Sequence, residues 1–199
     1  MEDFLKKILC AVVLASLAST SFAKQGGLLD ELSQTIKSHT AKAPATGQIE
    51  SAFSPEAGSE DLVLKVINSS EKTIRLAAYS FTSPRVVRAL LDAKKRGVDV
   101  QIVVDEKGNK SKASIAALNL VVNAGIPTRT ISTYAIHHDK FAISDSIHVQ
   151  TGSFNYSQAA AKSNSENVLV VWNNPEVAAS YLKHWESRFG QGSDYKSSY

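Results

Sequence analysis

The most informative stretch of this 199-residue chain is HHDKFAISDSIHVQTGSFN, residues 137–155. Residues 140–143 and 148–151 are rich in apolar and β-branched side chains, and the polar residues 144–146 separate them. Two short runs of this kind on either side of a polar turn are typical of a β-hairpin. We therefore expect a hairpin at the centre of the fold, followed at residue 152 by a second turn.

A cluster of polar side chains is predicted at one end of this hairpin. His138 and Lys140 are two residues apart, so they project from the same face of the first strand. The turn at Gly152 can bring Ser153 and Asn155 back towards them. An imidazole can act as nucleophile or acid, while ammonium, hydroxyl and amide groups donate hydrogen bonds. Together these groups form a receptor for phosphate oxygens and for the extra charge of a phosphoryl transition state.

Outward from the hairpin, strand-like and helix-like patterns alternate. The further strands are predicted at residues 49–53, 73–79, 98–104 and 167–172. The helices are predicted at residues 59–69, 84–96, 113–123 and 175–189, with Ser59, Ser83 and Ser111 as N-terminal caps and Gly190 as the last stop. This alternation indicates an α/β fold, a single domain with a mixed sheet covered by helices on both faces.

The N-terminus has the pattern of a targeting segment. Residues 1–23 contain two lysines, an apolar run of 11 residues and a small-x-small site that ends at Ala23. A spanning helix needs about 20 apolar residues, so we predict a signal peptide, with an uncleaved anchor as the alternative. Residues 24–48 have a leader or linker composition, and the domain is expected to cover residues 49–199. The predicted location is therefore periplasmic or secreted.

Composition restricts the chemistry that the mature chain can use. The only cysteine, Cys10, lies in the predicted signal peptide, so disulfides, thiolate catalysis and a Cys-based zinc site are excluded from the mature protein. The net charge of +3 and the pI near 8.9 are compatible with a polyanionic partner. No carboxylate cluster of the kind used by two-metal nucleases is evident, and we expect neither a metal nor another cofactor.

The spacing of the polar cluster resembles a known signature. The pattern H-x-K-x4-D-x6-G-S-x-N resembles the HKD motif of the phospholipase D superfamily; its members here are His138, Lys140, Asp145, Gly152, Ser153 and Asn155. The resemblance extends over residues 49–199 to the small bacterial periplasmic endonucleases of that superfamily. The blocks that match are residues 78–82, 93–100, 113–117 and 164–167.

The resemblance implies a role for each motif residue. His138 would be the catalytic nucleophile or acid, and Lys140, Ser153 and Asn155 would bind the substrate phosphate. Glu166 matches a glutamate that orients the catalytic imidazole, while Asp145 and Gly152 would be structural. A turn aspartate such as Asp145 commonly bonds to its own backbone. The other histidines are assigned no catalytic role, since His137 points to the opposite face and His148 and His184 are predicted to be surface groups.

Three functions fit these features. The first is a metal-independent endonuclease with little sequence preference that acts through a phosphohistidine on DNA, with RNA as a further candidate substrate. The second is a phospholipase D-type lipid phosphodiesterase or phosphatidyl transferase. The third is a binding module without activity, which would not need the His138 and Glu166 pair. Lys107, Lys110 and Lys112 follow a predicted strand and are candidate nucleic-acid contacts.

The chain has a single H-x-K motif, and this bears on its assembly. Phosphoryl transfer through a histidine calls for one imidazole that attacks phosphorus and another that protonates the leaving oxygen. Two copies of one chain related by a two-fold axis can supply both from identical surfaces. We therefore expect a homodimer with a shared active site, and no stable membrane partner.

Overall fold

The computed structural model describes residues 47–199, so the predicted signal peptide and residues 24–46 of the predicted leader lie outside the described residues. The described part forms strands, α-helices and one 3-10 helix. In chain order they are β1 (Ile49–Ser54), α2 (Ser59–Ser69), β2 (Thr73–Ala78), α3 (Pro84–Lys95), β3 (Asp99–Asp105), η1 (Lys107–Asn109), α4 (Lys112–Asn123), β4 (Thr128–Ile131), β5 (Lys140–Ser144), β6 (His148–Gly152), α5 (Gln158–Lys162), β7 (Glu166–Val171), α6 (Pro175–Gln191) and β8 (Ser193–Asp194).

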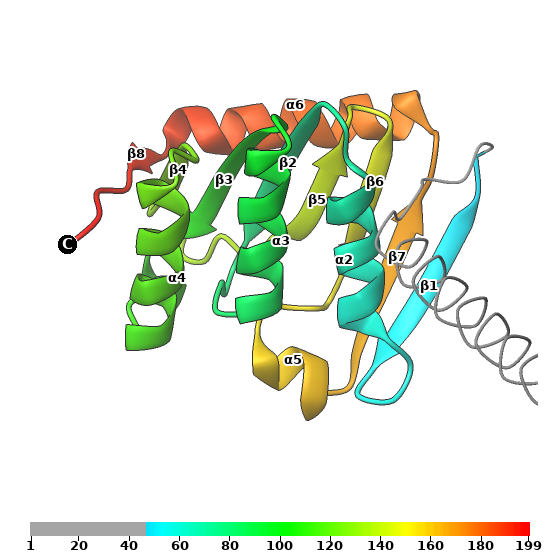
Figure 1. The fold of residues 1–199 in the computed structure, drawn as a ribbon, viewed down its shortest axis with the longest axis horizontal. Helices are drawn as coiled ribbons and strands as arrows, with labels where there is room; N and C mark the ends of the chain where they lie inside the picture. Colours follow the sequence, from blue (N-terminus) through cyan, green and yellow to red (C-terminus); the bar gives the residue numbers. More distant parts are fainter. Residues whose placement is uncertain (1–46) are drawn as a thin grey trace, which may run out of the picture. The chain divides into compact units, whose positions relative to one another are not determined.

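All the strands join one sheet in the order β1-β7-β6-β5-β2-β3-β4-β8. The pairs β2–β3 and β3–β4 are parallel, and the other neighbours are antiparallel. Helices α2, α3 and α4 lie side by side on one face, and α6 runs across the other face (Figure 1). The predicted mixed sheet with helices on both faces is confirmed.

Two apolar clusters fill the space between the sheet and its helices. The larger one lies under α2, α3 and α4, and its fully buried members include Leu76, Leu90 and Trp172. The smaller one lies under α6 and contains Phe141, Ile143 and Trp185. Phe141 and Ile143 of β5 therefore face the core under α6. Within residues 47–199, no helix is long and apolar enough to cross a bilayer.

The structure confirms two of the predicted helix caps and corrects two boundaries. The hydroxyls of Ser83 and Ser111 accept the backbone N–H groups of residues 86 and 114. Ser59 is not a cap, because α2 begins after Gly58, whose left-handed φ of 75° suits a residue without a side chain. Helix α6 continues through Gly190 to Gln191, since its apolar stripe still packs on the sheet at Phe189.

The C-terminal residues that follow α6 pack against the rest of the domain. Strand β8 pairs antiparallel with β4, and the Tyr195 hydroxyl donates a 3.0 Å hydrogen bond to Asn119 Oδ1. Neither strand was predicted, because β4 has only four residues and β8 only two, too few to show alternation.

Candidate active site

The predicted catalytic and phosphate-binding residues gather at one edge of the sheet. Strands β2 and β3 end there, β5 begins there with Lys140, β6 ends there with Gly152, and β7 begins there with Glu166. The register supports this placement, because Lys140 pairs with Ala78 and Gly152 with Val168. The carboxyl ends of parallel strands are a common place for ligand sites in such sheets.

His138 lies just before β5 rather than on it. The strand begins at Lys140, so the prediction that both residues share a strand was wrong by two residues. Both side chains still lie on the same side of the chain, because both contact Tyr79. The ring centroids of His138 and Tyr79 are 4.8 Å apart, and Lys140 Nζ lies 5.3 Å from the Tyr79 ring centroid. The Tyr79 ring therefore contacts both His138 and Lys140.

Lys140 is buried at the base of the site. Its side chain is only 6% exposed, and its Nζ donates a 2.9 Å hydrogen bond to the backbone oxygen of His138. Burial lowers the pKa of Lys140, and the nearby carboxylates of Glu166 and Asp139 oppose that shift. An ammonium in this position can neutralise charge on a phosphoryl group held beside His138.

Ser153 and Glu166 form a hydrogen-bonded pair at the same edge. The Ser153 hydroxyl donates to Glu166 Oε2 at 2.6 Å and accepts the backbone N–H of Asn167 at 3.1 Å. Asn164 Nδ2 donates to the other carboxylate oxygen of Glu166 at 3.0 Å. The side-chain oxygen of Asn155 is buried and has no hydrogen-bond partner among the described residues.

The expected contact between Glu166 and His138 is not made within this chain. Among residues 47–199, the carboxylate of Glu166 bonds to Ser153 and Asn164, and the His138 ring makes no hydrogen bond. Glu166 nevertheless acts on the site, because its charge raises the pKa of Lys140 against the effect of burial.

Asp145 lies at the opposite end of the hairpin and has a structural position. Its carboxylate accepts three backbone N–H groups, from Glu71, Lys72 and Thr73, at 2.7–2.9 Å. The expected bond to its own backbone was therefore wrong. The side chain instead ties the hairpin turn to the loop before β2, and this pins the register of β5 against β2.

Gly152 is the other motif residue with a structural role, and it lies where β6 meets β7. Its φ of 146° is unusual for L-residues, and an added Cβ would collide with the backbone oxygen of Asn167. Only glycine lets the chain pass this close to β7.

We predict that Gly152→Ala lowers the free energy of unfolding by about 2–4 kcal/mol, because the clash is with backbone that cannot rotate away. Urea denaturation followed by circular dichroism measures this difference. Gly190→Ala is the matched control, since no atom lies within 4 Å of its added Cβ inside α6. That variant is expected to be as stable as the parent or slightly more stable. Equal stability of the two variants would contradict the packing argument.

Asp105 and Asn109 hold the loop after β3 against the site, and neither was predicted as a site residue. The buried Asp105 carboxylate accepts the backbone N–H groups of His137 at 2.8 Å and Gly108 at 2.6 Å. Asn109 Nδ2 donates to the backbone oxygens of Tyr79 and Asp105 at 2.7 and 2.8 Å. The sequence signal for Asp105 was its place at the end of a buried strand, where a carboxylate needs partners.

The three candidate lysines lie on this anchored loop or directly after it. Lys107 is in η1, Lys112 begins α4, and both are exposed. Lys110 is exposed, and its Nζ lies 3.2 Å from Glu106 Oε1. Because Asn109 bonds to Tyr79, these lysines are positioned relative to His138 and Lys140 rather than on an independent loop.

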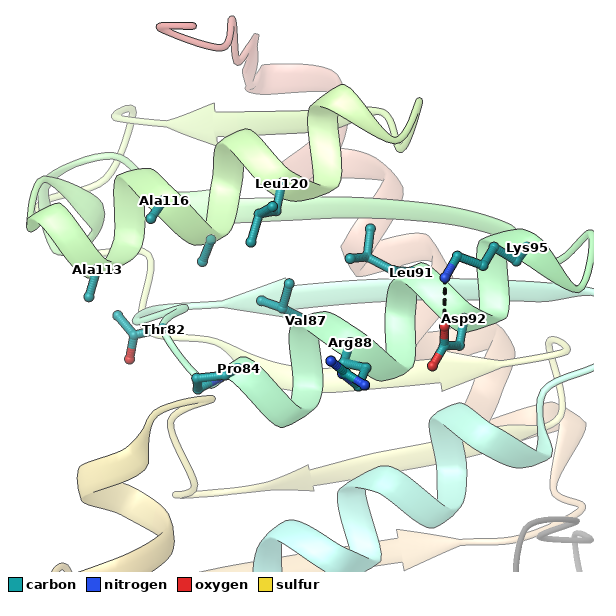
Figure 2. A pocket seen from close by; sticks show the side chains of 11 residues that line it. Thr82, Pro84, Val87, Arg88, Leu91, Asp92, Lys95, Ala113, Ala116 and Leu120 are labelled. Carbon is teal, nitrogen blue, oxygen red and sulfur yellow. Dashed lines mark hydrogen bonds and ion pairs between the residues drawn. The ribbon is translucent and has the colours of Figure 1, made fainter. Parts of the chain in front are cut away.

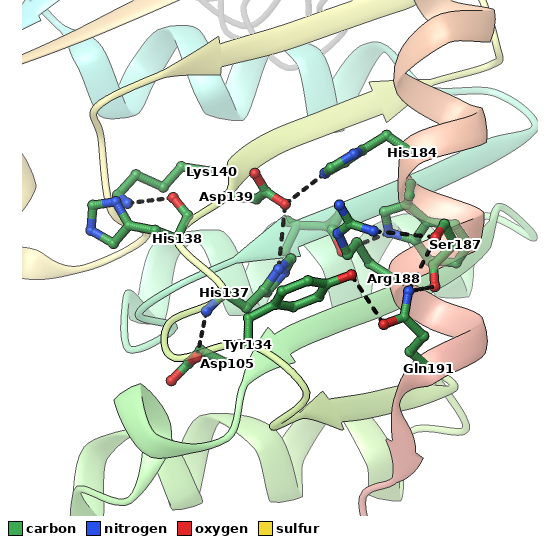
Figure 3. A network of polar contacts seen from close by, with 12 residues as sticks. Asp105, Tyr134, His137, His138, Asp139, Lys140, His184, Ser187, Arg188 and Gln191 are labelled. Atoms are coloured by element: carbon green, nitrogen blue, oxygen red, sulfur yellow. Dashed lines mark hydrogen bonds and ion pairs between the residues drawn. The ribbon is translucent and has the colours of Figure 1, made fainter.

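A second polar network lies on the α6 side of the segment that carries His138. Asp139 Oδ2 is 2.8 Å from His184 Nε2 and 3.3 Å from His137 Nδ1 (Figure 3). His137 is buried, and desolvation lowers its pKa although Asp139 and Asp105 raise it. Asp139 therefore anchors this irregular segment to α6.

The structure corrects one histidine prediction and qualifies another. His148 is not a surface group: it is 3% exposed, its ring lies 5.0 Å from Trp172, and its Nδ1 accepts the backbone N–H of Asn173. Both α2 and α6 contact β6, so alternation along this strand leaves no side facing water. His184 is half-exposed, with 39% of its side chain accessible.

Two cavities differ in their relation to these residues. A cleft of about 410 Å³ is bordered by His138, Asp139, Lys140 and Gly152, and it reaches α6 at His184. A second cavity of about 640 Å³ lies between α3 and α4, lined largely by apolar side chains (Figure 2). None of the predicted site residues borders the second cavity, so the first cavity is the candidate active site.

The polar groups at the candidate site suit an anionic ligand better than a metal ion. Within the described part of the chain, no group of three or more histidine, cysteine, aspartate or glutamate side chains is arranged to hold a metal ion. The donors at the sheet edge are instead an ammonium, a hydroxyl and an amide, which suit an anionic ligand.

Comparisons with known proteins agree with this geometry. Residues 63–189 match the family model described as "Cardiolipin synthase, PLD-like domain". The chain is 33% identical over 153 residues to the phospholipase D of Rickettsia conorii, and the match covers 77% of this chain and 75% of that protein.

Two solved structures share the fold. The phospholipase D family member Nuc from Salmonella typhimurium is 51% identical, with a TM-score of 0.75, and the match covers 76% of this chain and all of that one. NucT from Helicobacter pylori is 22% identical with a TM-score of 0.66, covering 75% of this chain and all of that one, which shows likeness of fold alone.

Proposed function

The chain belongs to the phospholipase D superfamily of phosphodiesterases, and from that premise we propose that it is an endonuclease that hydrolyses nucleic-acid phosphodiesters with little sequence preference. DNA is the proposed substrate, and RNA is a further candidate. The observation that carries this proposal is the anchored lysine loop. Exposed Lys107 and Lys110 flank Asn109, which bonds to the tyrosine that supports His138. Cations placed beside a phosphodiester site favour a polyanionic substrate.

The proposed reaction is a double displacement at phosphorus. One His138 attacks the phosphorus atom, and the bond to the leaving oxygen breaks as a second imidazole gives that oxygen a proton. Water then attacks the phosphohistidine, the same second imidazole takes its proton, and the histidine is released. Lys140, Ser153 and Asn155 are placed at the same edge and would hold the non-bridging oxygens.

We further propose that the second imidazole comes from another copy of the chain. Supporting this, Glu166 has no hydrogen bond to His138 of its own chain within residues 47–199, although it lies close enough to Lys140 to influence its pKa. In a two-fold dimer, the carboxylate of one protomer could orient the imidazole of its partner.

A periplasmic or secreted location is part of the proposal. It rests on the signal-peptide pattern of residues 1–23, which lie outside the described residues. Mass spectrometry of the protein recovered from the periplasm or medium tests it, because cleavage after Ala23 gives a mature N-terminus at Lys24.

An activity gel separates nuclease from lipid hydrolase. We predict that the purified mature protein degrades DNA embedded in the gel, in excess EDTA as well as without it, because Lys140, Ser153 and Asn155 supply the charge and donors. Release of headgroup from phospholipid vesicles is measured in parallel. Lipid release without DNA cleavage would favour the phospholipase alternative, and complete loss in EDTA that added metal restores would contradict the mechanism.

The lysine loop predicts a specific salt dependence. Lys107→Ala and Lys110→Ala should each weaken DNA binding on all sequences alike and reduce the slope of log affinity against log salt by about 1. Fluorescence anisotropy at several salt concentrations measures both quantities. Lys72→Ala is the matched control, since it removes an exposed lysine at the opposite end of β2. If all three variants behave alike, the loop does not contact the nucleic acid.

A further inference from the structure

The cleft beside His138 extends well past the motif residues. On its far side it is bordered by Ser180, Tyr181 and His184 of α6, which we call the α6 wall. The cleft volume of about 410 Å³ lies in the range of sites that take whole small-molecule ligands. A substrate held at His138 and Lys140 by one phosphate therefore has room for its neighbouring groups along this wall.

His184, the titratable residue of the α6 wall, is held in place by the segment that carries His138. His184 Nε2 lies 2.8 Å from Asp139 Oδ2, and an ionised carboxylate only accepts hydrogen bonds, so this nitrogen carries the proton. Nδ1 of His184 makes no hydrogen bond within the described residues, and 39% of the side chain is accessible. One nitrogen is thus committed to the protein and the other is open to a ligand.

The α6 wall combines aromatic and polar groups, and its rings pack on the core. The Tyr181 ring packs edge-on against Phe141 at 5.0 Å, and the His184 ring lies 5.9 Å from the same phenylalanine. Phe141 is itself 3% exposed in the core under α6. A fixed aromatic ring beside a hydroxyl and an imidazole suits a sugar or a base, which combine flat and polar surfaces. The acyl region of a lipid would need an apolar wall instead.

We propose that the α6 wall is a subsite for the nucleotide next to the scissile phosphodiester, with Nδ1 of His184 accepting a hydrogen bond from an N–H group of the neighbouring base. This inference rests on the proposed nuclease function. Asp139 directly follows His138 in the chain, so the residue that positions His184 is adjacent to the residue expected to attack phosphorus. The base of the adjoining nucleotide lies one sugar away from the scissile phosphate, so a contact with it is needed at short range.

The test compares two substrates that differ in what lies beside the scissile bond. A short single-stranded oligonucleotide has a neighbouring nucleotide, whereas bis(p-nitrophenyl) phosphate has none. We expect His184→Ala to lower the ratio of kcat/KM on the oligonucleotide to kcat/KM on the small diester about 5-fold, mainly through KM, as for a lost hydrogen bond between neutral groups. His184→Phe keeps a ring against Phe141 and is expected to show the same fall.

Lys183→Ala is the matched control, because Lys183 is the exposed neighbour of His184 on α6 and does not border the cleft. It should keep the wild-type ratio, and a fall equal to that of His184→Ala would show a general charge effect and overturn the subsite. A wild-type ratio in His184→Phe would also overturn it, since packing alone would then account for the residue. Failure of the nuclease proposal looks different: wild-type protein would hydrolyse the small diester but no oligonucleotide.

Discussion

His138→Ala should reduce nucleic-acid cleavage by several orders of magnitude, roughly 10³-fold or more, and leave the fold intact. In the proposed reaction the imidazole forms the covalent bond to phosphorus, and no neighbouring group can replace it. Lys140 is an ammonium committed to the backbone oxygen of His138, and Ser153 donates to Glu166. The measurement is the initial rate on a fluorescent DNA substrate at matched protein concentration.

The fold should survive this change because His138 contributes little to packing. Its side chain is exposed, and Tyr79 is the one aromatic ring that lies near it among the described residues. His148→Ala is the informative contrast, since it removes a buried ring that packs on Trp172 and accepts a backbone N–H. That variant should unfold at lower temperature but keep its activity per folded molecule. A well-folded His138→Ala protein with near-normal activity would remove His138 from the chemistry.

Much of the fold was predictable because it depends on local signals. The hairpin was marked by two apolar runs around a polar turn, and the structure has β5 and β6 there. Ser83 followed by proline, and Ser111 before an apolar run, marked helix starts that the structure confirms. The alternation of strands and helices then indicated a sheet covered on both faces. Each of these signals spans only a few residues, so it does not depend on distant parts of the chain.

The features that the sequence did not reveal all depend on residues far apart in the chain. The three N–H groups that Asp145 accepts come from residues 71–73, which only the pairing of β5 with β2 brings near. His148 is buried because α2 and α6 cover both faces of β6, a fact that its strand alone cannot show. Asp105 likewise lies at the candidate site because β3 ends beside the segment that precedes β5. Motif spacing predicted the candidate site residues, while tertiary contacts decide which other residues support them.

The proposed shared active site predicts that one inactive subunit disables a whole dimer. If two His138 residues act on one phosphate, a dimer of wild-type and His138→Ala chains has either no nucleophile or no acid, whichever way the substrate binds. Random pairing of equal amounts gives about a quarter wild-type dimers, half mixed dimers and a quarter inactive dimers. Activity should therefore fall to about a quarter of the all-wild-type value, whereas independent sites would retain about half.

The experiment needs mixed dimers of known composition. Co-expression of two chains with different affinity tags, followed by sequential purification on both tags, isolates the mixed species, and sedimentation velocity reports its mass. Wild-type chains paired with Lys72→Ala chains are the control, since Lys72 lies at the end of β2 away from the site and this pair should keep full activity. A Glu166→Gln chain paired with a wild-type chain extends the test to the residue expected to orient the imidazole. If the protein is a fully active monomer, or if mixed His138→Ala dimers keep half of wild-type activity, each chain carries a complete site, and Glu166 must then reach His138 by a rearrangement within one chain.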